Sequence, residues 1–223
     1  MFQMAANYQS IGKLIEEVCD LHGDVSRVFF SKGNNKSINL KKKQVRDVIF
    51  DGPKNISSDF LYSIDQYLEM LNRLIVQMEY EYYYSHWDFR SRIKQKESVV
   101  NKLFYYRFGK DILGEVPINK CLNDLLGFRI IVDGFEHSDC RELDDICNRI
   151  KDKYKINIID SSKHGYKGTH IYFYGENNFF PWELQIWNPA DTKQNEQLHK
   201  EHKSKRQYIY WPQEYVSNDP RKG

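Results

Sequence analysis

The sequence lacks the patterns of disulfide-rich, zinc-binding and membrane proteins. Its 223 residues include only four cysteines, which form no Cys-x-x-Cys pair and show no zinc-like spacing with histidine. We therefore expect reduced cysteines in a cytoplasmic protein, with neither a structural metal nor a disulfide framework. No basic segment followed by an apolar run opens the chain, so no signal peptide is predicted. No apolar stretch approaches the roughly 18 residues of a membrane helix, and we expect no membrane partner.

Two common nucleotide-binding motifs are also missing, since the chain has neither a Walker loop nor a Gly-x-Gly-x-x-Gly sequence. The formal net charge of +2 is small, so bulk charge does not indicate a nucleic-acid-binding protein, and DNA is not an expected partner. What is present in quantity is aromatic residues, at 15%. The length suits one sizeable domain, or a domain with an added helical layer.

The first 84 residues predict a helical region. Residues 1–25 have apolar residues at helical spacing, with Gly23 as the expected stop, and a second apolar stripe runs from Leu61 to Met78. The polar run 31–55 separates these helices and contains Lys32, Lys36, Lys41, Lys42, Lys43 and Arg46. Two interpretations of this run stay open: a solvated loop with a short helix, or a patch that faces phosphates.

A third helix, with two different faces, is predicted at 85–107. The spacing of Lys94, Ser98 and Lys102 would place them on one side of it, beside an apolar stripe. Two cations with a hydroxyl between them suit a polyphosphate. A solvent-facing helix with ordinary lysines is the alternative.

The remaining chain alternates short strands with helices, which predicts an α/β fold. We expect a mixed β-sheet flanked by helices, with the N-terminal helices as an added layer. The predicted strands are 128–132, 156–160, 170–174 and 181–187, and the predicted helices are 85–107, 139–153 and 191–208.

Two carboxylates stand out on the predicted strands. Alternation puts Glu183, Gln185 and Trp187 on one face of an otherwise apolar strand, which indicates either a site or a half-exposed polar face. Asp124 lies just before the strand at 128–132, where a carboxylate can bind a metal ion or act as a turn residue.

Five motifs follow one another in a specific order. They are Arg92-Ile93-Lys94 with Ser98 and Lys102; Asp124-Leu125-Leu126-Gly127-Phe128-Arg129; His164-Gly165-Tyr166 with His170; Glu183-Leu184-Gln185-Ile186; and Glu201-His202. In this order they resemble the synthetase domain of the RelA/SpoT family, the alarmone pyrophosphokinases. The resemblance covers 85–208 and implies a nucleotidyltransferase-like domain there, after a helical region at 1–84 and before a short tail at 209–223. The chain looks like a small, stand-alone synthetase.

The resemblance implies transfer of the β,γ-pyrophosphate of ATP to a nucleotide 3′-hydroxyl, with Mg²⁺ as the cofactor. It makes Asp124 and Glu183 the catalytic residues and the Mg²⁺ ligands, and Glu183 could also accept the hydroxyl proton. The implied ATP-binding residues are Arg92, Lys94, Ser98, Lys102 and Arg129, with the two arginines stacked on adenine. The implied acceptor-binding residues are Tyr166, which would stack on the acceptor base, His170 and Gln185.

Two acceptors stay open. One is GDP or GTP, which would give ppGpp or pppGpp; the other is the 3′-terminal adenosine of tRNA, which toxic small members of the family use. The sequence departs from the alarmone-synthetase pattern at Lys167-Gly168-Thr169, where Arg-Ser-x is usual, and at Trp187-Asn188, where Arg-Thr is usual. Local basic residues could hold an acceptor stem by its phosphates: Lys41, Lys42, Lys43, Lys203, Lys205 and Arg206.

We therefore favour a tRNA-modifying toxin that blocks translation. Such a toxin requires a neutralising antitoxin protein as its partner. The alternative of another class is a non-catalytic module that binds nucleotide or RNA without chemistry.

Overall fold

The computed structural model describes residues 2–31, 38–50, 56–109, 113–137 and 141–204, with side chains from residue 7 to residue 201. The predicted tail at 209–223 lies outside the described residues. So do two of the predicted RNA-contact residues, Lys205 and Arg206, and the side chain of Lys203.

A five-stranded mixed sheet forms the centre of the protein, in the order β1-β2-β5-β4-β3. Strands β2 and β5 run parallel, and the other neighbouring pairs are antiparallel. The strands are β1 (Arg90–Ile93), β2 (Leu126–Ile131), β3 (Ile156–Asp160), β4 (Thr169–Phe173) and β5 (Trp182–Trp187). This arrangement confirms the predicted mixed α/β sheet flanked by helices.

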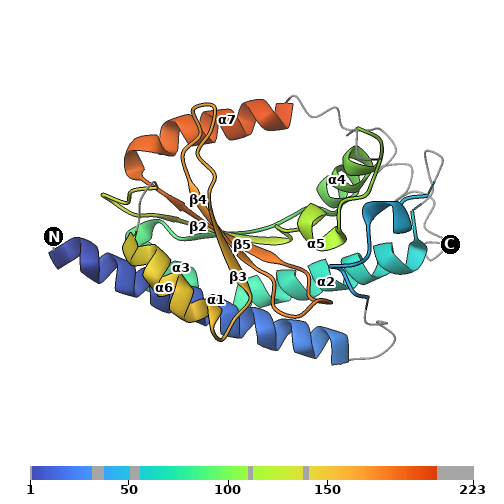
Figure 1. Ribbon diagram of the computed structural model, residues 1–223, viewed down its shortest axis with the longest axis horizontal. Coiled ribbons are helices and arrows are strands. Elements are labelled where there is room, and N and C mark those ends of the chain that lie inside the picture. The colour runs from blue at the N-terminus through green and yellow to red at the C-terminus, as the bar shows by residue number, and fades with distance from the viewer. Residues whose placement is uncertain (1, 32–37, 51–55, 110–112, 138–140, 205–223) are drawn as a thin grey trace.

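Helices cover the two faces of the sheet unequally. On one side lie α1 (Phe2–Ser31), α2 (Ser58–Gln77) and α6 (Arg141–Lys151), and on the other lies α7 (Thr192–Ser204) (Figure 1). Helix α4 (Lys96–Phe108) and the short α5 (Ile118–Cys121) stand at one end of the sheet. The remaining short elements are η1 (Val45–Asp47), α3 (Tyr80–Tyr83), η2 (Ser85–Trp87) and η3 (Pro189–Asp191).

The core lies between the sheet and the three helices α1, α2 and α6. Alternate residues of the central strands point into it, so Phe128, Trp182 and Leu184 are almost completely buried. The apolar stripe of α1 packs against them, and Ile11 and Leu14 are fully buried. None of the helices in the described part of the chain combines the length and the apolar character that a membrane span requires.

The predicted helix at 85–107 is wrong in its first half. Arg90–Ile93 forms the edge strand β1, paired antiparallel with β2, and α4 begins only at Lys96, after Gln95 in an extended conformation. Ladder hydrogen bonds to β2 are available to this segment, and they outweigh its weak helical pattern. Lys94 therefore precedes the helix and does not share a helical line with Ser98 and Lys102.

The first helix does not stop at Gly23 but continues to Ser31. A glycine within a helix costs only about 1 kcal/mol relative to alanine. The extra turns bury Phe29, whose ring contacts Tyr67 at a centroid distance of 5.0 Å. This packing offsets the weak helical propensity at Gly23.

Candidate active site

The register of the sheet brings the candidate residues together. Residues paired across neighbouring strands project to the same face. Two adjacent rows cross the sheet on the face that α7 covers: Arg92, Gly127, Glu183 and Tyr172 in one, and Arg90, Arg129, Gln185 and His170 in the other. Between Arg92 and Glu183 stands Gly127, where an added Cβ would meet only the Arg92 carbonyl, at 3.8 Å. The floor between the arginine and the carboxylate is therefore open.

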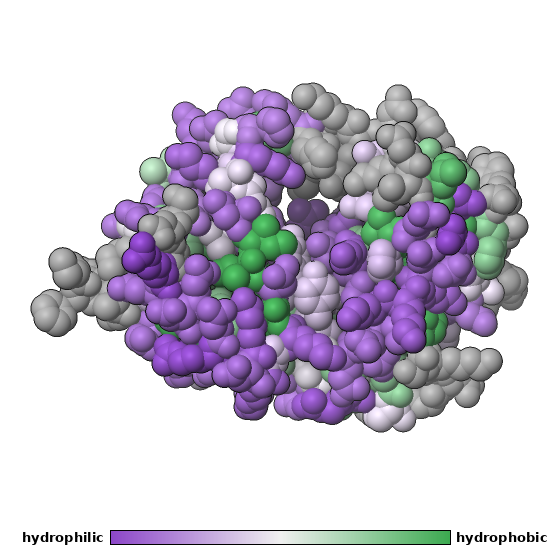
Figure 2. Space-filling view, viewed as in Figure 1, coloured by the Kyte–Doolittle hydropathy of each residue, from purple (hydrophilic) through white to green (hydrophobic). Residues whose placement is uncertain are grey.

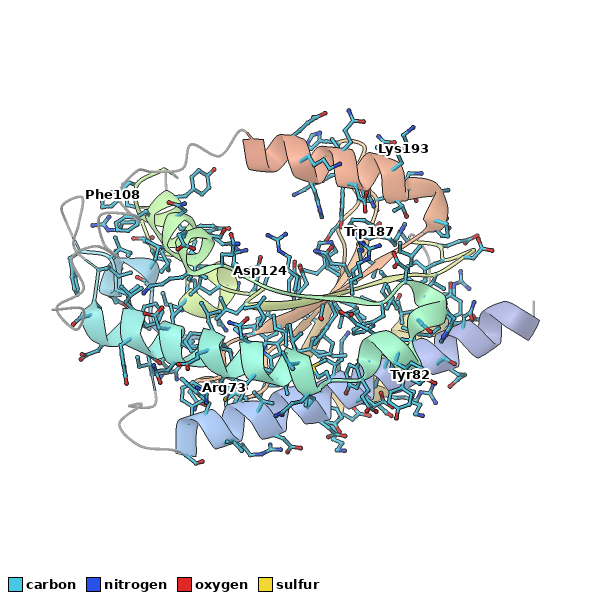
Figure 3. The ribbon with its side chains drawn as sticks, turned by 180° about the vertical axis from the view of Figure 1, so that it is seen from behind. Arg73, Tyr82, Phe108, Asp124, Trp187 and Lys193 are labelled. Carbon is cyan, nitrogen blue, oxygen red and sulfur yellow. The ribbon has the colours of Figure 1, made fainter. Side chains whose placement is uncertain are left out.

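A cavity of about 480 Å³ lies over these rows. Among its lining residues are Arg92, Lys94, Ser98, Arg129, Asp124, Glu183 and Gln185, which sequence reasoning assigned to the site. The surface is hollowed on the side of α7, with hydrophilic atoms at the bottom of the hollow (Figure 2). Asp124 and Trp187 lie on this side of the sheet, whereas Arg73 and Tyr82 lie on the other (Figure 3). Four cationic and two acidic side chains line the cavity, a balance that suits a phosphate-bearing ligand.

Two lysines hold Asp124. The Lys94 ammonium donates to Oδ2, and Lys102 Nζ donates to Oδ1 at 3.1 Å and to Asn123 Oδ1 at 3.0 Å. Burial by itself would raise the pKa of Asp124, but the charges and hydrogen bonds of Lys102 and Lys94 hold that pKa below its ordinary value. Asp124 is thus a carboxylate that stays ionised. Lys102 is not among the residues that line the cavity, and it contacts the site by its bond to Asp124.

Glu183 is 7% exposed and fully partnered. His170 Nδ1 lies 2.9 Å from Oε1, and Gln185 Nε2 donates to Oε2 at 2.8 Å. Burial and the charge of Asp124 would raise the pKa of Glu183, yet the hydrogen bond from His170 keeps it below the ordinary value. His170 is not among the residues that line the cavity, so it stands behind Glu183.

Tyr166 is also placed behind the cavity lining. Its hydroxyl lies 2.7 Å from His170 Nε2, and Trp187 Nε1 donates to the same hydroxyl at 3.0 Å. The imidazole of His199, on α7, stacks on the Tyr166 ring at a centroid distance of 5.5 Å and an interplanar angle of 18°. A base that stacks on this face of Tyr166 must displace His199, which itself lines the cavity.

The loop that carries Tyr166 is fixed by a tight turn and by α7. His164 and Gly165 have φ angles of 49° and 85°, and Lys163 and Tyr166 exchange two backbone hydrogen bonds across them, as in a type I′ turn. Asn195, fully buried on α7, accepts from the Lys167 amide at 3.0 Å and donates to its carbonyl at 2.6 Å. These two bonds anchor the loop to the helix.

The cavity contains two carboxylates of the kind that bind Mg²⁺, Asp124 and Glu183. Within the described residues, no group of three His, Cys, Asp or Glu side chains is placed to hold a metal ion. Asp124 and Glu183 are nevertheless two carboxylates of one cavity, near enough for the charge of one to affect the pKa of the other. Protein sites for Mg²⁺ often supply one or two carboxylates and leave the remaining positions to water and substrate phosphates.

Sequence reasoning missed Arg90, Tyr172, Glu196 and His199, and it placed Trp187 on the same strand face as Glu183 and Gln185 without giving it a role. Glu196 Oε1 lies 3.6 Å from Arg129 Nη1, and Arg129 Cζ lies 4.4 Å from the centroid of the Trp187 ring. The period of two could have found Arg90 and Tyr172, because each stands two residues from a candidate on its own strand. Nothing in the polar sequence of α7 marks the side that faces the cavity.

The comparisons with known proteins are distant. No family model and no curated protein matches this sequence. Solved structures do match, among them a GTP pyrophosphokinase family protein from Streptococcus pneumoniae, at 16% identity over 68% of this chain and 78% of that one, with a TM-score of 0.38. The small alarmone synthetase 1 from Bacillus subtilis matches in two complexes.

Bound to its product pppGpp, that synthetase shows 17% identity over 63% of this chain and 77% of its own, with a TM-score of 0.35. Bound to AMPCPP, it shows 17% identity over 63% of this chain and 74% of its own, with a TM-score of 0.32. The structural neighbours are thus pyrophosphokinase and alarmone-synthetase proteins. Because the similarity is low, the proposals below rest on the residues of this chain.

Proposed function

We propose that this chain is a cytoplasmic, Mg²⁺-dependent pyrophosphokinase that transfers the β,γ-pyrophosphate of ATP to the 3′-hydroxyl of a nucleotide. The observation that carries the proposal is the union in one cavity of a cationic group, Arg92, Lys94 and Arg129, with the ionised carboxylates Asp124 and Glu183. Cations bind the polyphosphate, and carboxylates serve a metal ion and a hydroxyl. The order of the sequence motifs supports the same reaction.

The donor half is supplied by β1, β2 and the start of α4. Arg92 and Arg129 would hold the adenine between two guanidinium planes, since such planes stack on aromatic rings. Lys94, Lys102 and Ser98 would bind the phosphates.

In the transfer, the acceptor 3′-oxygen forms a bond to the β-phosphorus of ATP. The bond between that phosphorus and the oxygen that bridges the α- and β-phosphates breaks, and AMP leaves with this oxygen. The hydroxyl proton passes to Glu183. A carboxylate with a low pKa is a weak base, so Glu183 orients the hydroxyl first and takes its proton late. When bound by Asp124 and Glu183, Mg²⁺ would neutralise phosphate charge and make the hydroxyl more acidic.

For the acceptor we propose the 3′-terminal adenosine of tRNA, which would make the chain a translation-inhibiting toxin with a protein antitoxin. Lys41 and Lys42 are exposed and Lys43 is half-buried, and in the described part of the chain no acidic side chain pairs with them. Adjacent unpaired cations can hold nucleic acid by its phosphates. GDP or GTP is the competing acceptor, and a binding module without chemistry is the competing class.

The test is an acceptor assay with γ-³²P-ATP, Mg²⁺ and either deacylated tRNA or GDP. We expect label on tRNA, and we expect periodate oxidation of the tRNA 3′ end to abolish it. Label on GDP alone would refute the tRNA acceptor, and label on neither would refute the enzyme.

The same assay tests the two carboxylates. Asp124→Asn and Glu183→Gln should each lower turnover by about 100-fold or more, since each removes a group that acts in the transition state. The exposed controls Asp152→Asn and Glu176→Gln should retain wild-type turnover. Full activity in either site variant would remove that residue from the mechanism.

A further inference from the structure

Trp187 lies at the end of β5, and it touches both halves of the proposed site. The side chain is fully buried. One face of its indole ring lies against Arg129, with the guanidinium carbon 4.4 Å from the ring centroid. The indole nitrogen donates to the Tyr166 hydroxyl at 3.0 Å. The same residue therefore contacts a group on the donor side and a group on the acceptor side.

The contact with Arg129 orients a guanidinium plane. A cation over an aromatic face is attracted by the ring quadrupole, and the other contacts of Arg129 are long, at 3.6 Å to Glu196 and 4.0 Å to Asp88. Arg129 also lines the cavity, so a flat ring bound there could stack on the guanidinium from the side away from the indole. Any aromatic side chain of similar size at position 187 would retain this effect.

The contact with Tyr166 begins a chain of hydrogen bonds that ends on Glu183. The indole N–H is a donor only, so it occupies one lone pair of the Tyr166 oxygen and directs the phenol proton to His170 Nε2, 2.7 Å away. The His170 proton then sits on Nδ1, which lies 2.9 Å from Glu183 Oε1. This second effect needs the indole N–H and is lost with any side chain that lacks it.

We propose that Trp187 is a positioning residue that serves both substrates. The face of its ring sets the plane of Arg129. Its N–H group sets the orientation of Glu183 through Tyr166 and His170. The inference rests on the proposed pyrophosphokinase function and adds a positioning role for Trp187, which lines the cavity. It predicts that the two effects can be separated by substitution.

The experiment compares Trp187→Phe, Trp187→Leu and Tyr166→Phe with the wild type. Binding of AMPCPP, whose methylene bridge prevents transfer, is measured by calorimetry. Turnover is measured with ATP and the acceptor, deacylated tRNA or GDP, that the wild type labels. Trp187→Phe should lower kcat by about 3- to 10-fold, the range of one hydrogen bond, and leave the Kd for AMPCPP within about 2-fold. Trp187→Leu should also weaken AMPCPP binding, by about 3- to 10-fold.

Tyr166→Phe deletes only a hydroxyl, so it tests the chain of hydrogen bonds without leaving a large cavity in the core. It should reproduce the kcat loss of Trp187→Phe, and the double variant should show no further loss, because both changes break one chain. Wild-type kcat in Trp187→Phe, or multiplied losses in the double variant, would overturn the proposal. A wild type that labels no acceptor would overturn the proposed function instead, and the Phe and Leu variants would still decide the contact with Arg129 through AMPCPP binding.

Discussion

His22 should make the stability of this protein depend on pH in the mildly acidic range. The side chain is 2% exposed on α1, and its Nε2 lies 3.0 Å from the Phe180 carbonyl oxygen. Burial lowers the pKa of His22 to about 4 from the ordinary 6.5, against a smaller raising effect of that carbonyl. Below pH 6.5 the unfolded chain takes up a proton at this residue, while the folded chain stays neutral until about pH 4.

The stability linked to His22 is thus complete above pH 6.5, falls progressively between pH 6.5 and pH 4, and is fully lost below pH 4. At 1.36 kcal/mol per pH unit the full loss is about 3 kcal/mol, and about 2 kcal/mol of it falls between pH 7.5 and 5.0. The measurement is urea unfolding, followed by tryptophan fluorescence, at these two pH values. His22→Gln can still donate to the carbonyl but cannot titrate, so the free energy of unfolding should fall by about 2 kcal/mol less than in the wild type.

A destabilised control separates this effect from a general loss of stability. Val18, one turn before His22, is fully buried, and Val18→Ala keeps the histidine. It should lower the free energy of unfolding at both pH values and retain the wild-type pH dependence. The reasoning is refuted if His22→Gln and the wild type lose equal stability between pH 7.5 and 5.0.

Two further predictions concern the loop and the basic run. Asn195→Ala removes both hydrogen bonds to the Lys167 backbone from a buried position, so the free energy of unfolding should fall by about 1–3 kcal/mol. Hydrogen exchange at the Tyr166 amide should become faster, and unchanged exchange would contradict the anchoring role. Reversing the charges of Lys41–Lys43 to glutamate should raise the KM for tRNA by at least about 10-fold and flatten its salt dependence, while transfer to GDP and a Lys151→Glu control stay at wild-type values. Equal effects on both acceptors would contradict a tRNA-docking patch.

Much of the fold could be read from the sequence because hydrophobic periodicity reports burial directly. The strand at 181–187 alternates in a way that a helix cannot accommodate, and the structure has β5 at Trp182–Trp187. The strand at Arg90–Ile93 was missed because four residues with two arginines carry little periodic signal, and only the pairing with β2 defines it. Local pattern cannot show which strand becomes a neighbour.

The candidate site was predictable as a set of residues but not as an arrangement. Spacing could place Asp124 before a strand, but not the ammonium of Lys94 on its carboxylate, because this contact joins segments 30 residues apart. The position of His199 on Tyr166 was equally hidden, since it depends on how α7 rotates about its own axis. Such contacts follow from packing in three dimensions.

The sheet order has a consequence for how specificity could change. The residues proposed to bind the donor come from one stretch, residues 90–129, and those proposed to bind the acceptor come from another, residues 163–187 with α7. The two meet along the parallel pair β2 and β5, where Gly127 and Glu183 are neighbours. Substitutions in the loop before β4 could therefore change the acceptor while the donor-side residues stay in place, provided that Trp187 keeps its contact with Arg129.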